Sequence, residues 1–225
     1  MWDLHHYFQI NNEKIDLQFD ISYFRDLKVP YSLSSYHASR FQNRVPTMVI
    51  NVFSKSTWRA DIGEHVDYCK LLKIPIYVVF PAYYVTSAIY KPPFLRAYIL
   101  QPSGEYKIQE LREISMEEGE KSNPDTVIDV SDIVPFRLGL LKRKKKHEGD
   151  LALYRVILLD PQKFVILPTT SEKEKEKADK EKERADKEKE RADKEKERAD
   201  KEKERADKAE RKIVELESKI KKLNP

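Results

Sequence analysis

Residues 48–80 read MVINVFSKSTWRADIGEHVDYCKLLKIPIYVVF. This segment opens with a nearly continuous apolar run of strand length, and a second such run extends from Ile74 to Phe80. Because runs of this kind are typical of central strands covered on both faces, we expect two buried strands here. Between them, Asp61 is followed three residues later by Glu64, a pattern typical of a helix N-terminus. The segment therefore predicts a strand, a helix from Asp61 to about Leu72 with Asp61 as its cap, and a second strand.

Apolar residues that alternate with polar ones predict further strands outside this segment. Ile15, Leu17, Phe19 and Ile21 alternate in this way and indicate a half-buried strand with all four side chains facing inward. Later strands are expected at residues 94–101, 106–111, 127–130, 136–141, 151–159 and 164–167. A central strand, a helix and a central strand followed by hairpins predict an α/β fold, in which a helix packs on a mixed β-sheet.

The charged residues are concentrated near the C-terminal end of the chain. Lys and Arg (43) together with Asp and Glu (39) account for 82 of the 225 residues, and residues 172–223 contain 40 of these. Because such a segment cannot bury an apolar core, we expect a globular domain at 1–171 and a charged helical stalk at 172–225. The remaining sequence holds 22 basic and 20 acidic residues. Its bulk charge therefore does not by itself indicate nucleic-acid binding.

The stalk has a seven-residue repeat that is typical of coiled coils. Two positions of the repeat, here called the seam positions, face a partner helix in a coiled coil. Only the last part of the stalk, at 206–223, has apolar residues at both seam positions: Ala206, Ala209, Ile213, Leu216, Ile220 and Leu223. Ile at the first seam position and Leu at the second favour a parallel dimer, so we expect a homodimer closed by a short zipper. A trimer or tetramer is left open, and so is a disordered charged tail. Upstream, opposite charges four residues apart, such as Glu183 and Lys187, favour a long single or loosely paired helix.

Several functional classes lack their sequence signatures. None of the five glycines lies in a phosphate-binding motif, and the histidines are scattered without an H-E-x-x-H pair. We therefore expect no cofactor and no metal. Cys69 is the only cysteine, which argues against a disulfide framework and fits a reducing compartment. The chain start lacks a signal-peptide pattern and no uninterrupted apolar run is long enough to span a membrane, so we expect a cytoplasmic protein without membrane contact.

Part of the sequence resembles a nuclease family. Its motifs follow one another at a characteristic spacing: Val45-Pro46-Thr47, an apolar strand containing Asn51, the turn Ser54-Lys55-Ser56-Thr57, the helix start Asp61-Ile62-Gly63-Glu64-His65, and the strand that ends before Pro81. This order resembles the Uma-type family of restriction endonucleases, in the PD-(D/E)XK nuclease superfamily. The resemblance covers roughly residues 15–111 and continues more loosely to Asp160. It implies a restriction-endonuclease-like fold, and many relatives also end in a charged coiled coil.

The residues at the family's active-site positions differ from the family pattern. Such nucleases bind Mg²⁺ through an Asp and a Glu, and a nearby Lys polarises the attacking water. The resemblance places Thr47 at the Asp position, Asn51 at the Glu position and His65 at the Lys position. Because neutral Thr and Asn lack the charge that draws a strongly hydrated Mg²⁺ ion, the resemblance implies a degenerate site without hydrolysis. Asp20 is the residual candidate carboxylate. Phe80 stands where relatives carry a further Asp.

Other polar residues allow two interpretations each. Asp61, Glu64 and His65 share a helical face and include metal-ligand types, but a capping carboxylate beside a polar helix surface is the favoured interpretation. Lys55 replaces a turn proline of the family and is interpreted as a solvated turn residue rather than as a stand-in for the missing Lys. His5 and His6 adjoin a terminus that is expected to be disordered, and no role is assigned to them.

Three functional hypotheses follow from these observations. The first is a catalytically inactive nuclease-fold domain that acts as an oligomeric interaction protein or a nucleic-acid-associated protein. The second is an active Mg²⁺-dependent DNA endonuclease that uses Asp20, and the third is a pure protein-binding module. Nucleic-acid contact would come from a basic hairpin loop, since adjacent cationic side chains can bind the phosphates of the backbone. This loop comprises Lys142, Arg143, Lys144, Lys145 and Lys146. A solvated hairpin tip that deters edge aggregation is the alternative interpretation of the loop.

Overall fold

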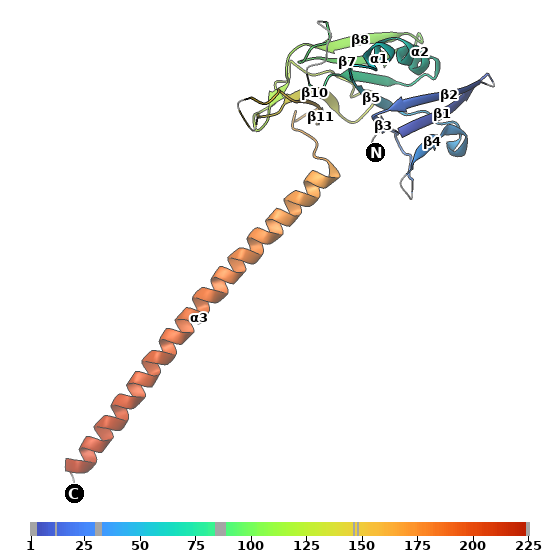
Figure 1. Ribbon diagram of the computed structural model, residues 1–225. Coiled ribbons are helices and arrows are strands. Elements are labelled where there is room, and N and C mark those ends of the chain that lie inside the picture. The colour runs from blue at the N-terminus through green and yellow to red at the C-terminus, as the bar shows by residue number, and fades with distance from the viewer. Residues whose placement is uncertain are drawn as a thin grey trace. The chain divides into compact units, whose positions relative to one another are not determined.

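The computed structural model describes residues 4–11, 13–29, 33–83, 89–145, 147 and 149–223. The chain forms two compact units, Met1–Leu167 and Pro168–Pro225. The first unit combines β-sheets with short helices, and the second is a single long helix (Figure 1). The predicted mixed α/β class with a long C-terminal helix is therefore confirmed.

Within the described residues the secondary structure follows the chain in a simple order. The strands are β1 (Leu4–Ile10), β2 (Glu13–Phe19), β3 (Ile21–Tyr23), β4 (Ser35–His37), β5 (Met48–Val52), β6 (Ile76–Phe80), β7 (Leu95–Leu100), β8 (Tyr106–Leu111), β9 (Met116–Glu117), β10 (Arg137–Lys142) and β11 (Tyr154–Leu159). The helices are the 3-10 helix η1 (Ala38–Phe41), α1 (Trp58–Ile62), α2 (Glu64–Leu71) and α3 (Thr170–Leu223).

A five-stranded sheet in the order β3-β5-β6-β7-β8 forms the centre of the first unit. Strands β5 and β6 are parallel, and α1 and α2 lie in the connection between them, while the other neighbours are antiparallel. A parallel pair needs such a crossover, because a tight hairpin can join only antiparallel strands. Two three-stranded sheets, β2-β1-β4 and β11-β10-β9, complete the unit.

Each face of the central sheet packs in a separate apolar cluster. Met48 and Ile50 of β5 pack with residues of the β10 region, whereas Val49 packs with Phe19 of β2 and Cys69 of α2. Because side chains alternate along a strand, Asn51 lies on the same face as Val49. The predicted buried strands β5 and β6 are thus confirmed, and Asn51 lies on the side where the helices and the β2-β1-β4 sheet pack.

Several local predictions were wrong. The helix begins at Trp58 rather than Asp61, and Gly63 separates α1 from α2. The expected strands at 127–130 and 164–167 are reduced to single bridges, Ile128 to Leu138 and Ile166 to Leu159. Ile21 is 48% exposed although alternation placed it inside. The reason is that the chain bends at Asp20, so that Ile21 begins β3 and pairs with β5 in another sheet.

His5 and His6 lie in β1, a strand that the sequence analysis did not predict. His6 is fully buried, and its Nδ1 lies 2.8 Å from the carbonyl oxygen of Leu4. Its ring packs against Phe19 and Tyr36 at centroid distances of 5.1 and 5.5 Å. Burial lowers the pKa of His6 to about 4, so the ring is neutral at neutral pH.

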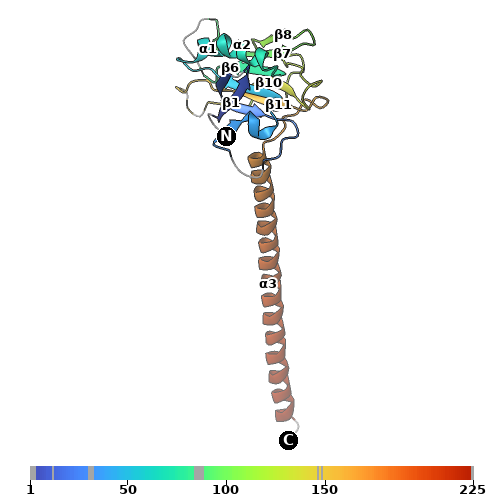
Figure 2. The same ribbon diagram turned by 90° about the vertical axis from the view of Figure 1, so that its right-hand side faces the viewer.

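The second unit, α3, begins with a capping box. The hydroxyl of Thr169 accepts a hydrogen bond from the amide of Glu172, and the Glu172 carboxylate accepts one from the amide of Thr169. Three Lys–Glu pairs four residues apart, including Lys187 with Glu183 at 2.5 Å, lie along its exposed surface. Figure 2 shows α3 as one unbroken helix. Among the described residues, no helix has the length and apolar composition that crossing a bilayer requires.

The buried His6 predicts a pH dependence of stability. The unfolded chain takes up a proton on His6 near pH 6.5, whereas the folded chain does so only near pH 4. The free energy of unfolding should therefore fall as the pH is lowered from about 6.5 to about 4, with a loss on the order of 3 kcal/mol. Denaturant unfolding at several pH values measures this loss. His6→Phe should remove it and His5→Phe should keep it; an undiminished loss in His6→Phe would contradict the assignment.

Candidate functional site

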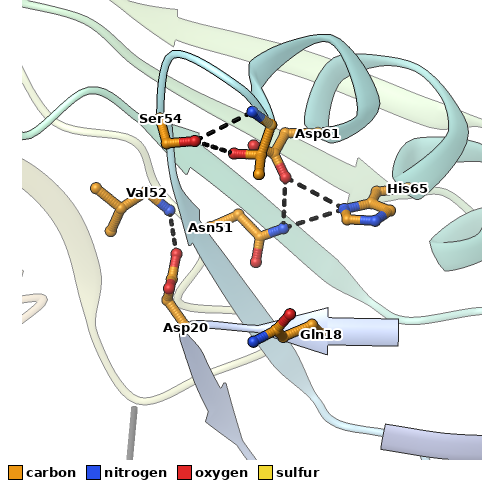
Figure 3. Close-up of a pocket in the computed structure, with 8 residues that line it drawn as sticks. Gln18, Asp20, Asn51, Val52, Ser54, Asp61 and His65 are labelled. Carbon is orange, nitrogen blue, oxygen red and sulfur yellow. Dashed lines mark hydrogen bonds and ion pairs between the residues drawn. The ribbon is translucent and has the colours of Figure 1, made fainter. Parts of the chain in front are cut away.

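A cavity of about 280 Å³ lies at the end of β5, where α1 and α2 pack on the central sheet. Figure 3 shows that its side chains come from the end of β2, from β5 and its following turn, and from both helices. The lining residues are Gln18, Asp20, Asn51, Val52, Ser54, Thr57, Asp61 and His65.

Asn51 is the buried centre of this site, with only 4% of its surface exposed. Its amide nitrogen donates a hydrogen bond to Oδ1 of Asp61 at 2.8 Å and lies 3.2 Å from Nδ1 of His65. The same nitrogen is 3.4 Å from the hydroxyl of Tyr77. The amide oxygen of Asn51 has no hydrogen-bond partner in the protein and points toward Gln18 (Figure 3). One end of the amide is therefore fixed, and the other is left for a donor.

Asp61 is a buried carboxylate, 2% exposed, rather than the helix cap that the sequence predicted. Its Oδ1 accepts the hydrogen bond from Asn51 and lies 3.2 Å from Nδ1 of His65, one helical turn away. Its Oδ2 has no hydrogen-bond partner in the protein. The hydroxyl of Tyr77 donates to the backbone carbonyl of Asp61 at 2.8 Å. Burial and the Asp61 charge raise the pKa of Tyr77, which keeps this hydroxyl protonated as a donor.

Asp20 connects the N-terminal sheet to the same site. It occupies the bend between β2 and β3, and its Oδ2 accepts a hydrogen bond from the backbone amide of Val52 at 2.6 Å. Val52 is the last residue of β5 and follows Asn51 directly. The carboxylate of Asp20 thus lies at the strand end that also carries Asn51, in a position that the bend makes accessible to the cavity.

The turn after β5 forms another wall of the cavity. The hydroxyl of Ser54 accepts a hydrogen bond from the backbone amide of Thr57 at 3.1 Å and lies 2.8 Å from the hydroxyl of Thr57. These contacts fix a tight turn just before α1. The Ser-x-Ser-Thr sequence therefore positions the first helix, and with it Asp61, over the strand end.

The structure brings together three of the sequence-predicted positions, Asp20, Asn51 and His65. Thr47 is not among them, because it precedes β5 and its hydroxyl accepts a hydrogen bond from the amide of Arg25. Glu64 is exposed on α2. Phe80 and Lys55 do not line the cavity either: Phe80 is buried in the core and Lys55 is exposed in the turn.

Asp61 and Gln18 line the cavity, although the sequence analysis did not assign either residue to a binding site. The four-residue spacing of Asp61 and His65 was a usable signal for the first, because residues at this spacing meet on a helix. The orientation of Gln18 was predictable from strand alternation, because its side chain points away from the face on which Leu17 and Phe19 are buried.

The cavity does not fit the Mg²⁺ site that the nuclease resemblance implies. Mg²⁺ prefers several carboxylate and water oxygens in octahedral geometry. Here the Glu position holds an amide whose nitrogen faces Asp61, and Oδ1 of Asp61 already accepts that hydrogen bond. Among the described residues, no three His, Cys, Asp or Glu side chains are grouped so as to hold a metal ion together.

The basic loop joins β10 to β11 and lies beside acidic residues. Lys142 pairs with Glu117 at 2.7 Å, and this carboxylate raises the pKa of Lys142. The backbone amide of Lys144 donates to the carboxylate of Glu118 at 3.1 Å. A hollow of about 640 Å³ at the loop is lined by Glu118, Arg143, Lys144, Lys145, Asp150, Leu151 and Leu153. Lys146 lies outside the described residues. The loop is therefore of mixed charge.

The predicted zipper lies in the part of α3 whose side chains are not described. The backbone of Ala206, Ala209, Ile213, Leu216, Ile220 and Leu223 is helical. The pairing of these residues between chains stays a prediction.

Comparisons of the chain with protein-family models, with curated protein sequences and with solved structures find no match. The resemblance to Uma-type nucleases therefore stays a prediction that depends on the spacing of the motifs in residues 45–81.

Proposed function

We propose that this protein is a non-hydrolytic relative of the restriction-endonuclease-like enzymes and acts as an oligomeric binding protein. Its globular unit would bind a ligand or partner through the cavity around Asn51. The stalk would hold two copies together in the cytoplasm. No cofactor or bound metal is part of the proposal.

The observation that carries this proposal is the hydrogen bonding of Asn51. A nuclease of this type needs at that position a carboxylate that is open to Mg²⁺. Asn51 instead donates to Asp61 at 2.8 Å in a site where both residues are almost fully buried. Because the amide satisfies one oxygen of a buried carboxylate, it lowers the cost of burying that carboxylate in the absence of a cation. The contact thus supports a structural and binding role for these residues.

The alternative is an active Mg²⁺-dependent DNA endonuclease, which is supported by the two carboxylates, Asp20 and Asp61, that line the same cavity. Plasmid DNA incubated with the full chain and Mg²⁺ or Mn²⁺ decides between the two. We expect no metal-dependent nicking above the level of the Asp20→Ala variant, because the amide at position 51 leaves too little negative charge to bind the metal. Gel electrophoresis of the plasmid over time measures the nicking.

Two controls make the plasmid result interpretable. Asp16→Ala, an exposed carboxylate on the same strand region, tests whether any activity depends on this cavity. Metal-dependent nicking by the wild type that Asp20→Ala abolishes and Asp16→Ala preserves would establish the endonuclease and overturn the binding proposal.

The proposed homodimer predicts that substitutions at two adjacent apolar residues of α3 have different effects on dimer formation. In the heptad repeat Ile213 lies on the seam, whereas Val214 lies off it. Ile213→Glu combined with Ile220→Glu should therefore halve the molar mass in light scattering, since buried like charges prevent pairing of the seam. Val214→Glu is the matched control and should leave the dimer intact. An unchanged mass in the Ile213→Glu, Ile220→Glu variant would place self-association in the globular unit.

Nucleic-acid contact through the basic loop is a second candidate, because Arg143, Lys144 and Lys145 line one hollow. If the loop contacts phosphates, changing these three residues to Gln should weaken DNA binding. It should also reduce the slope of log K against log salt by up to about 3, since each phosphate contact releases a counterion. Given the neighbouring acidic residues, we expect the loop variant to bind DNA as the wild type does. Fluorescence anisotropy across salt concentrations measures both quantities, and a reduced slope would establish the loop as a nucleic-acid contact.

A further inference from the structure

The hollow beside the basic loop combines exposed leucines with cationic side chains. Leu151 and Leu153 both line it and are 67% and 46% exposed. Single apolar residues are common at protein surfaces and need no explanation, whereas apolar residues that gather in one hollow with a polar rim are typical of a contact surface. The two leucines therefore indicate that this hollow, called the loop hollow below, receives a partner.

The hairpin places its apolar and its cationic residues on two neighbouring arms. The backbone amide of Arg143 donates to the carbonyl oxygen of Leu153 at 2.9 Å, directly beyond the last β10–β11 pair, Lys142 with Tyr154. The two arms thus stay side by side past the ends of the strands. One arm contributes three cationic residues to the loop hollow, and the other contributes the two leucines.

The two carboxylates of the loop hollow are used to fix the backbone of the loop. Glu118 accepts a hydrogen bond from the amide of Lys144 at 3.1 Å, and Asp150 accepts one from the amide of His147 at 2.9 Å. Among the described residues, no ion pair includes any of the three cationic side chains that line the hollow. These side chains are exposed, so their charges can be offered to a ligand.

A ligand that matches the loop hollow carries both negative charge and aliphatic or aromatic side chains. A nucleic acid supplies phosphates, but single strands gain most of their apolar contact by stacking on aromatic rings, and none of the seven lining residues is aromatic. Two carboxylates in the lining also repel a chain of phosphates. An acidic peptide with leucine-like side chains meets both walls of the hollow, because it brings apolar groups as well as charge.

The shape of the loop hollow also favours a peptide. Its volume of about 640 Å³ lies within the range of about 300–1,000 Å³ that is usual for ligand pockets, so it has space for more than one side chain. Leucines that bind a bilayer belong to a surface that enters the lipid, whereas Leu151 and Leu153 line a concavity. A concave apolar wall fits side chains that are inserted between the two arms.

We propose that the loop hollow docks an acidic segment of a partner protein. Apolar side chains of the segment would pack on Leu151 and Leu153, and its carboxylates would pair with Arg143, Lys144 and Lys145. This surface goes beyond the function proposed above, because β10 packs on the face of the central sheet opposite to Asn51. It depends neither on the cavity at Asn51 nor on the stalk.

Titration of the full chain into fluorescein-labelled acidic octapeptides, followed by fluorescence anisotropy, tests the proposal. The panel consists of peptides of Asp and Glu that contain two leucines placed two, three or four positions apart, which covers the extended and the helical spacing. We expect at least one member to bind with a dissociation constant of about 10–100 μM, as suits a small contact with exposed charges. The same peptide with both leucines replaced by serine should bind at least tenfold more weakly.

Matched variants test the apolar wall of the loop hollow. Leu151→Ser combined with Leu153→Ser should weaken binding of the best peptide at least tenfold, because two apolar contacts are lost. Both side chains are exposed, so these changes should leave the fold intact. Ile108→Ser, a change of a 52% exposed apolar residue on β8, is the control and should leave the affinity unchanged.

The cationic wall has its own pair of variants. Changing Arg143, Lys144 and Lys145 to Gln should lower the affinity about tenfold at low salt and remove most of its salt dependence, because exposed ion pairs are weak individually and are screened by salt. Changing the exposed residues Lys14, Lys107 and Lys163 to Gln removes the same charge elsewhere and should leave the affinity unchanged.

Several results would overturn the inference. These are no binding by any member of the panel, equal binding of the serine peptide, or equal losses in a variant and its control. Tighter binding of a single-stranded DNA oligonucleotide, or of phosphatidylserine vesicles, through the same three cations would assign the loop to a nucleic acid or to a membrane surface. Loss of the dimer in Leu151→Ser, Leu153→Ser would place a second copy of the chain in the hollow. The plasmid assay is independent of all these results.

Discussion

The hydrogen bond from the Asn51 amide to the Asp61 carboxylate is the contact on which the site depends. A carboxylate that is 2% exposed is costly to bury unless donors surround it. Asn51 of β5 supplies one donor at 2.8 Å, and His65 of α2 places Nδ1 at 3.2 Å from the same oxygen. One buried polar cluster thus links a central strand to two helices that also pack through apolar residues. Replacing the amide by a second carboxylate would put two like charges in contact there.

The same contact is the reason for proposing binding rather than hydrolysis at this site. Catalysis on a phosphodiester requires a cation that stabilises developing negative charge, and the protein must hold that cation with anionic oxygens. In this cavity one oxygen of Asp61 is already committed to a neutral amide. The other oxygen of Asp61 and the amide oxygen of Asn51 are buried and have no hydrogen-bond partner among the described residues.

The apolar pattern predicted the centre of the fold but not its polar contacts. β5 and β6 were predictable because short continuous apolar runs rich in Val and Ile are typical of covered strands. β1 was missed because the polar residue His6 takes an inward position in the alternation Leu4, His6, Phe8, and only the aromatic packing around it makes this tolerable.

The candidate site was predictable only in part, for a related reason. Asp61 was misjudged because a carboxylate at the start of a helical pattern is the same in sequence whether it caps a helix or is buried. The motif spacing grouped Thr47 with Asn51. A strand rises about 3.3 Å per residue, so four positions separate the two by roughly 13 Å. Only Asn51 reaches the end of β5 where Asp20, Asp61 and His65 gather.

The small size of the cavity limits its affinity for a ligand, and the self-association expected of α3 would raise that affinity. Even an ideal ligand gains at most about 1.5 kcal/mol per heavy atom, so a head group of four or five atoms reaches only about 6–7.5 kcal/mol, or a dissociation constant of a few micromolar at best. A single globular unit would therefore hold so small a group only briefly. If two units are joined through α3, the second contact becomes intramolecular, which raises the overall affinity without any new contact. A site this small is consequently most useful in a chain that self-associates, and self-association is what the apolar end of the heptad repeat predicts.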